Sequence, residues 1–191
     1  MILRLLSFLA GCVLLACGQQ NAVYNKPYFD VDSLIDRQAH QLAAHKPRLH
    51  KVAAVDGRTE KKTWQPDSLQ WAAELDVFRQ LDDVNRPGLH NLYTSTRTKD
   101  TLSNLKVMSY RTGSAPLKWL NLYFLPHTGG LKKITAWRQE SNALFTAHRA
   151  VALEFDDWRG QPRLARYTVQ GAQKMVVGDS VTYQISGTVV Y

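Results

Sequence analysis

The chain has only two cysteines in its 191 residues, and both lie within the first 17 positions. The sequence from position 18 onward therefore holds no thiol, which excludes disulfides, thiol catalysis and cysteine metal sites there. Long apolar runs are scarce as well, and the longest, Leu5 to Ala16, is interrupted by Ser7. As a helix, Ile2 to Ala16 would span only ~22 Å of the ~30 Å hydrocarbon core, so we expect no membrane-spanning anchor.

Compact catalytic motifs are also missing from the sequence. It has no Gly-x-Ser-x-Gly elbow, and Gly129-Gly130 lies between two strand-like segments with no helix after it that could form a phosphate loop. We therefore predict no catalytic residues, no cofactor and no enzymatic activity.

Three histidines, His40, His45 and His50, recur every five residues. On a helix this spacing leaves consecutive rings ~140° apart, whereas zinc ligands on one helix have to share a face. Two pairs of adjacent carboxylates, Asp82-Asp83 and Asp156-Asp157, fall in segments that we expect to be turns, where aspartate is common. We predict no metal site from either pattern.

The first 16 residues resemble a bacterial lipoprotein signal peptide, with Arg4 followed by an apolar segment. Leu14-Leu15-Ala16-Cys17 is similar to the lipobox, in which an aliphatic and a small residue precede an acylated cysteine. Leu9-Ala10-Gly11-Cys12 fits the local pattern better, but cleavage before Cys12 would leave an apolar region of only about six residues, below the usual ~7–15. We predict lipidation at Cys17, with Cys12 as the second choice, and anchoring to a membrane through the acyl chains.

Three segments follow from this prediction: a signal peptide over 1–16, a lipidated N-terminus and flexible tether over 17–27, and one domain over 28–191. Cleavage removes a single charged residue, Arg4, so the formal net charge falls only from +8 to +7. The basic residues are spread along the chain, which suits attraction to anionic lipid or to an envelope polymer. We expect one of these, or another envelope protein, as the partner, and no nucleic acid.

Two helices are predicted in the N-terminal half of the domain. The first begins at Asp30 or Asp32 and ends before Pro47, and the second runs from Pro66 to about Leu81. Between them, Asp56-Gly57 joins two extended segments and predicts a hairpin. We expect a loop over 82–88.

Everything after Gly88 has the composition and length of β-strands. Short connections without intervening helices predict an antiparallel meander. The fold class is therefore α+β, with two N-terminal helices packed on a curved antiparallel sheet, for which a half-open barrel is one possible form. The predicted strands are 89–97, 104–111, 117–125, 131–139, 143–155, 163–171 and 180–190.

Tryptophans are the remaining candidates for a binding site. Trp71 lies on the apolar stripe of the second helix and is expected in the core. Trp119 and Trp137 fall on neighbouring strands, where they could line a sugar- or lipid-binding face or form a cross-strand pair. Packing is the interpretation that we favour.

Two segments of the domain and the end of the leader resemble a group of uncharacterised small lipoproteins from Bacteroidota. These segments are Leu14 to Gly18 (LLACG), Asp67 to Leu75 (DSLQWAAEL) and Tyr167 to Met175 (YTVQGAQKM). The resemblance implies an envelope with two membranes and brings no assigned activity. Because Gly18 follows the cysteine in place of the aspartate that retains lipoproteins in the inner membrane, we expect the outer membrane, with the domain facing the periplasm.

Two functions fit these features. The first is a lipid-anchored, non-enzymatic binding or accessory module of the envelope. The alternative is a carrier or receptor that holds an acyl chain or a lipoprotein in a hydrophobic cavity under the curved sheet, which is an analogy at the level of the fold. A cavity of several hundred Å³ lined by inward apolar side chains would favour the carrier.

Overall fold

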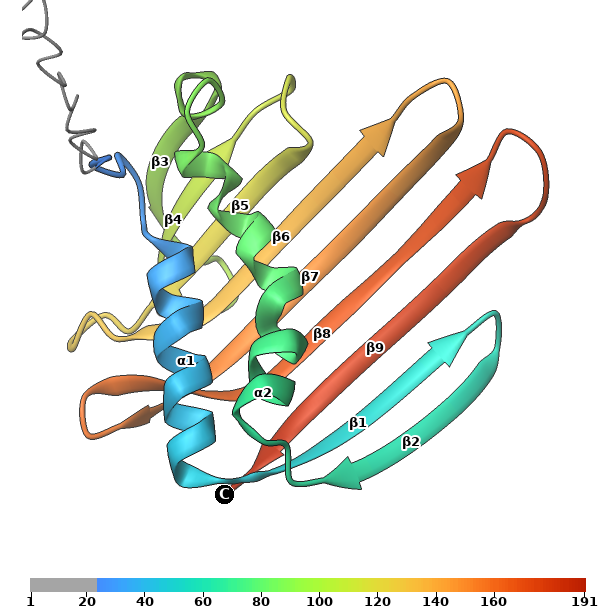
Figure 1. Cartoon of the computed structure of the whole chain (residues 1–191). Helices are drawn as coiled ribbons and strands as arrows, with labels where there is room; N and C mark the ends of the chain where they lie inside the picture. The colour runs from blue at the N-terminus through green and yellow to red at the C-terminus, as the bar shows by residue number, and fades with distance from the viewer. Residues whose placement is uncertain (1–23) are drawn as a thin grey trace, which may run out of the picture.

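The computed structural model describes residues 24–191, which form one antiparallel sheet with helices on one of its faces (Figure 1). The helices are α1 (Val31–His45), α2 (Ser68–Leu75) and the 3-10 helices η1 (Asp76–Asn85) and η2 (His90–Leu92). The strands are β1 (Arg48–Val55), β2 (Arg58–Trp64), β3 (Thr94–Lys99), β4 (Lys106–Arg111), β5 (Leu117–Phe124), β6 (Leu131–Ser141), β7 (Phe145–Trp158), β8 (Gln161–Met175) and β9 (Ser180–Val190). The α+β class predicted from the sequence is confirmed.

The nine strands are ordered β2-β1-β9-β8-β7-β6-β5-β4-β3, and every neighbouring pair is antiparallel. Strands β3 to β9 form the predicted meander. The hairpin of β1 and β2, predicted from Asp56-Gly57, joins the far side of β9 and extends the sheet. Strands β2 and β3 are the edges, so the sheet does not close.

Helix α1 has strong signals at both ends. The side chain of Asp30 accepts a hydrogen bond from the backbone nitrogen of Ser33, and Lys46 ends the helix in a left-handed conformation with a φ of 50°. Pro47 follows immediately, as the sequence predicted. The residues that this helix buries are Val31, Leu34, Ile35, Gln38 and Leu42.

The second helix begins with a capping box between Asp67 and Gln70. It continues as η1 through Asn85, so the loop predicted over 82–88 was wrong in its first half. The reason is tertiary, because Asp82 and Asn85 are buried and bind distant backbone groups. The strand predicted from Leu89 was also wrong in its first residues, where η2 lies before β3.

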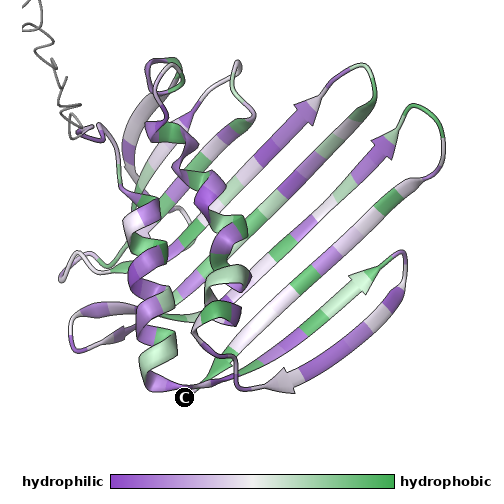
Figure 2. Ribbon diagram, in the orientation of Figure 1, coloured by the Kyte–Doolittle hydropathy of each residue, from purple (hydrophilic) through white to green (hydrophobic). Residues whose placement is uncertain are grey.

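The core fills the space between the helices and the sheet. Figure 2 shows apolar residues alternating with polar ones along the strands, as expected when one face of a sheet is buried. Trp71 and Phe78 of the helices pack against this face and are fully buried, and Tyr167 of β8 meets Phe78 edge to face. The largest buried strand residues include Leu117, Leu120, Leu122, Ile134, Leu153, Phe155 and Leu164.

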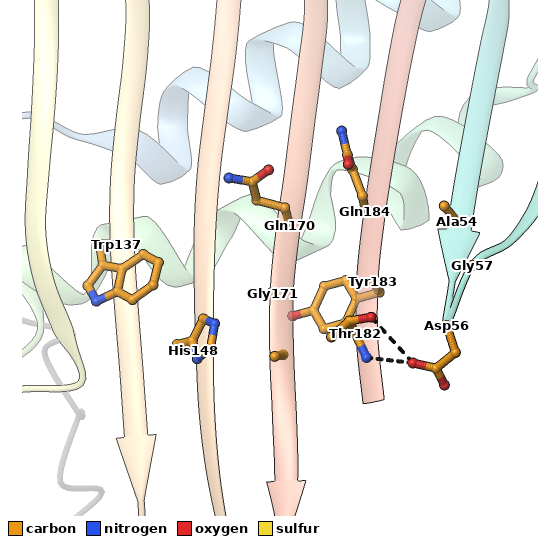
Figure 3. Close-up of a pocket in the computed structure, with 11 residues that line it drawn as sticks. Ala54, Asp56, Gly57, Trp137, His148, Gln170, Gly171, Thr182, Tyr183 and Gln184 are labelled. Atoms are coloured by element: carbon orange, nitrogen blue, oxygen red, sulfur yellow. Dashed lines mark hydrogen bonds between the residues drawn. The ribbon is translucent and has the colours of Figure 1, made fainter. Parts of the chain in front are cut away.

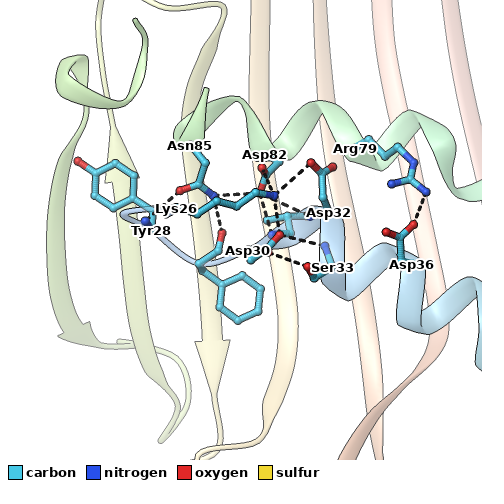
Figure 4. A network of polar contacts seen from close by, with 11 residues as sticks. Lys26, Tyr28, Asp30, Asp32, Ser33, Asp36, Arg79, Asp82 and Asn85 are labelled. Carbon is cyan, nitrogen blue, oxygen red and sulfur yellow. Dashed lines mark hydrogen bonds and ion pairs between the residues drawn. The ribbon is translucent and has the colours of Figure 1, made fainter. Parts of the chain in front are cut away.

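A polar cluster joins the N-terminal segment to η1 (Figure 4). The ammonium of Lys26 lies 2.6 Å from Asp30, 2.7 Å from Asp82 and 3.2 Å from Asp32. Asp82 also accepts a hydrogen bond from the backbone nitrogen of Val31 at 2.9 Å, which satisfies a buried donor that has no partner within the first turn of α1. The cluster therefore fixes where α1 begins relative to η1.

The charges of this cluster are unequal. Burial alone would raise the pKa of Asp30, but the hydrogen bonds from Lys26 and Ser33 lower it to about 2. Burial and the nearby charge of Asp82 raise the pKa of Asp32 above its usual value. Asp30 and Asp82 thus lie closest to the ammonium of Lys26, whereas Asp32 lies farther away and is repelled by the charge of Asp82.

Candidate binding face

The face of the sheet opposite the helices is uncovered and carries a row of side chains that crosses five strands. The pairing register places Trp137 of β6 beside Ala150, Ala150 beside Gln170, Gln170 beside Gln184, and Gln184 beside Ala54 of β1. A second row, which starts two residues away along each strand, runs from His148 through Ala172 to Thr182. At ~4.8 Å per strand, the first row is ~19 Å long.

These two rows line a hollow of ≈ 400 Å³. Figure 3 shows it from the uncovered side, with the helices behind the strands. Alanines at positions 54 and 172 leave space, whereas Trp137 and His148 stand at one end and Gln170 and Gln184 lie nearer the middle. Small and large side chains thus produce a depression on a sheet face that would otherwise be flat.

Trp137 and His148 stack on each other. Their ring centroids are 5.1 Å apart and the planes are inclined by only 24°. The imidazole therefore packs against one face of the indole. Trp137 is half-buried, whereas His148 is exposed. A supported aromatic ring with one accessible side is suited to stacking on an apolar ring face of a ligand.

The two glutamines supply hydrogen-bonding groups beside the aromatic pair. Gln170 and Gln184 are cross-strand partners, and both are exposed. Within the described part of the chain, neither amide makes a side-chain hydrogen bond. Each can therefore offer two donors and one acceptor to a ligand.

Charge is almost absent from this hollow, although the chain is basic overall. The one charged lining residue is Asp56, whose carboxylate already accepts a hydrogen bond from the backbone nitrogen of Thr182 at 2.8 Å. No lysine or arginine lines the hollow as the structure describes it, so an anionic ligand would find no counter-charge there. The arrangement fits a neutral ligand that has hydroxyl or amide groups around apolar rings.

One tyrosine on the covered face, Tyr183, supports the strands below this hollow. Tyr183 lies against Gly171, where an added Cβ would come within 2.7 Å of the tyrosine oxygen. Its hydroxyl oxygen accepts a hydrogen bond from Arg149 at 3.0 Å, and Arg149 also bonds Gln80 of η1. The position of β8 and β9 under Gln170 and Gln184 is thereby tied to the helical layer.

The structure brings together the two tryptophans that the sequence places on neighbouring strands. Trp119 and Trp137 are direct cross-strand neighbours on the open face, as expected, and both are half-buried. Trp71 is buried in the core, which confirms its prediction. Lys62 lies over the ring of Trp64, and Arg159 lies over the ring of Trp158. These two tryptophans end β2 and β7, at the end of the sheet opposite the β1–β2 turn.

The three regularly spaced histidines are separate. His45 donates a hydrogen bond from Nδ1 to the carbonyl of Gln41 and meets the ring of Trp158 edge to face, whereas His50 pairs with Thr63. Over residues 24–191, no group of three or more metal-binding side chains is found.

The two carboxylate pairs have different roles. Asp83 forms an ion pair with Arg138 of β6, and Asp82 belongs to the Lys26 cluster, so turn chemistry was the wrong interpretation for this pair. Asp157 does cap a turn, because it accepts a hydrogen bond from the backbone of Gly160 at 2.8 Å. Its neighbour Asp156 lies 3.2 Å from Lys132.

Sequence reasoning missed His148, Gln170 and Gln184 as site residues. Each is an ordinary polar residue on the exposed side of a strand, and only the register reveals that they share a row or adjacent rows. The available signal was the alternation of small and polar residues at Gln170, Ala172, Thr182 and Gln184 across the β8–β9 hairpin. Cys12 and Cys17 lie outside the described residues.

None of the described helices is long and apolar enough to cross a membrane. The resemblance to small Bacteroidota lipoproteins stays a prediction. Comparison of the chain with protein-family models, with characterised proteins and with solved structures finds no match.

Proposed function

We propose that the protein is a lipid-anchored, non-enzymatic binding module of the bacterial outer membrane that faces the periplasm and holds a neutral glycan on the open face of its sheet. The observation that carries the binding role is the uncharged hollow with the Trp137–His148 stack beside two unbonded glutamine amides. The anchoring role is supported by the lipobox-like sequence that ends at Cys17.

A glycan suits this hollow because of its two kinds of surface. The carbon–hydrogen face of a sugar ring is apolar and can stack on the indole, and the hydroxyl or acetamido groups at the ring edge can bond Gln170 and Gln184. The row is ~19 Å long, so several sugar rings of one chain can lie across the strands. A sugar polymer of the envelope has this chemistry.

We propose that the sheet is a half-open barrel with β2 and β3 as its unpaired edges and with its second face accessible. The alternative function, a carrier of acyl chains, is not proposed. The region where such a cavity would lie, between helices and sheet, is occupied by side chains such as Trp71, Phe78 and Phe155, all fully buried.

The binding role is tested by titrating the purified protein with a tetrasaccharide of N-acetylglucosamine and following tryptophan fluorescence. Trp137→Ala should weaken binding by about tenfold or more, because an aromatic ring on which a ligand stacks contributes ~2 kcal/mol to binding. The matched control is Trp158→Ala, which removes an indole that ends β7 and does not line the hollow. Equal binding by both variants, or no binding by the natural protein, would refute the proposal that the hollow binds a glycan.

The anchoring role is tested separately by the intact mass of the protein extracted from membranes. We expect a mature chain that starts at Cys17 and carries acyl chains. A chain that starts at Cys12, or one without acyl groups, would contradict this assignment.

A further inference from the structure

Apolar side chains gather at one end of the sheet. Eight of the twelve exposed large apolar residues in the described chain lie at the end where β6, β8 and β1 finish. Val177, Val176 and Leu144 are the most exposed of them, at 88%, 72% and 68%. The other members are Tyr24, Val55, Leu92, Met175 and Val181.

The turns that carry these residues support one another. The backbone nitrogen of Val176, in the β8–β9 turn, donates to the carbonyl of Leu144, in the β6–β7 turn, at 2.9 Å. The β1–β2 turn is joined to the same group through a bond from Asp56 to Thr182. Figures 1 and 2 show these hairpin tips extending beyond the helices, with apolar residues at their ends. Exposed apolar residues held on ordered turns indicate a contact surface.

The first described residue lies at the same end of the sheet. Tyr24 contacts His90 of η2, and η2 leads directly into the start of β3. The strand directions place the start of β3 at the same end as the finish of β4, β6 and β8. Six residues lie between Cys17 and Tyr24, so the seven residue steps from one to the other reach at most ~25 Å. An anchor at Cys17 would therefore hold this end of the sheet close to the bilayer.

The charges at this end favour an anionic surface. Arg58, Arg111 and Lys174 are exposed on strands or turns next to the apolar tips. Of the acidic groups on these turns, Asp56 is bound by Thr182 and Glu140 by Arg138, and Asp179 of the β8–β9 turn is exposed. Basic residues near anionic headgroups and apolar side chains that reach the acyl boundary act together in interfacial binding.

We infer that the tips of the β6–β7 and β8–β9 hairpins insert into the surface of an anionic phospholipid bilayer and orient the anchored domain on it. The inference rests on the proposed anchor at Cys17. The strands then rise away from the membrane, and the open face with Trp137 is accessible from the periplasm. Among the possible occupants of this apolar end, the bilayer is favoured by the short tether and by the basic residues.

The test uses the lipidated full chain in vesicles of phosphatidylethanolamine and phosphatidylglycerol, labelled at single cysteines with an environment-sensitive fluorophore. Val177→Cys reports on the hairpin tip, and Leu102→Cys is the control, because it is 94% exposed in the turn at the opposite end of the sheet. We expect a blue shift at position 177, lost emission there when nitroxide-labelled lipid is added, and neither change at position 102.

Several outcomes would overturn the inference. Equal emission at the two positions would mean that the hairpin tips stay in water. A blue shift at 177 without quenching by nitroxide lipid would mean that a protein or a second copy of the chain covers the tips. A missing anchor can be distinguished from tips that stay in water. Without the anchor, the mass of the purified protein would include no acyl chains and the protein would not remain with the vesicles.

Discussion

The ring of Tyr167 occupies the space that a side chain at position 187 would need. A Cβ built on Gly187 would lie 2.2 Å from two ring carbons of Tyr167, which sits on the neighbouring strand and is buried. The hydroxyl of this tyrosine donates a hydrogen bond to Glu74 of α2, and Glu74 is paired with Lys51 of β1 at 2.6 Å. One glycine therefore permits a contact that links β8, β9, β1 and the helical layer.

We expect Gly187→Ala to lower the free energy of unfolding by about 3 kcal/mol, the upper part of the range for overpacking, because Tyr167 has to leave both its site and Glu74. Gly113→Ala is the matched control, because no atom lies within 4 Å of the added Cβ and its φ is not positive. Chemical unfolding of both variants measures the difference. Similar stability for the two would contradict the packing described for Tyr167.

Removing only the hydroxyl tests the polar half of this contact. Tyr167→Phe should cost about 1–3 kcal/mol, since the carboxylate of Glu74 is mostly buried and would lose one of its partners. Tyr123→Phe, on the open face of β5, should change the free energy of unfolding by much less. A loss of the same size in both variants would mean that the bond to Glu74 contributes nothing specific.

The Lys26 cluster predicts opposite effects for two aspartates of the same helix end. Asp30→Ala should cost about 1 kcal/mol near pH 6, as loss of an N-cap does. The pKa of Asp30 is about 2 in the fold, below the ~3.9 of an unfolded chain, so its contribution is present above pH ~4 and disappears as the pH falls toward 2.

Asp32→Asn should instead leave the free energy of unfolding unchanged or raise it slightly near pH 6. Burial and Asp82 raise the pKa of Asp32, which means that its ionised form is disfavoured in the fold. Urea unfolding of both variants at several pH values between 2 and 7 measures these effects. A loss for Asp32→Asn as large as that for Asp30→Ala would contradict the arrangement of charges around Lys26.

Buried tyrosines predict a second pH effect at the alkaline end. Burial raises the pKa of Tyr93 to about 12, and its hydroxyl donates to the carbonyl of Leu117 at 2.9 Å. Below pH 10 both the folded and the unfolded chain hold this proton. Above pH 10 the unfolded chain releases it first, so stability should fall between pH 10 and 12, and it should fall less steeply in Tyr93→Phe. Unfolding followed across this range would show parallel slopes if Tyr93 did not contribute.

Local signals in the sequence were sufficient for much of the fold. Asp30 and Pro47 bound α1, Asp56-Gly57 forms a hairpin, and Gly129 turns between β5 and β6 with a φ of 69°. The extension of η1 to Asn85 had no local signal, because the buried Asp82 and Asn85 are held by residues more than 50 positions away. Aspartate and asparagine near a Pro-Gly pair are otherwise typical of loops.

The position of β1 and β2 in the sheet was also not predictable from local patterns. These strands pair with β9, at the other end of the chain, through contacts such as Leu49 with Val189. The same limit applies to the open face. The Trp119–Trp137 pair follows from two adjacent strands, but the row from Trp137 to Gln184 depends on the register across three further strands.

The place where a glycan binds is measured directly by amide chemical shifts during titration with the N-acetylglucosamine tetrasaccharide. We predict the largest changes at Trp137, His148, Gln170 and Gln184, and small changes along α1. Changes concentrated on the helices, or no changes at saturating sugar, would contradict the proposed function.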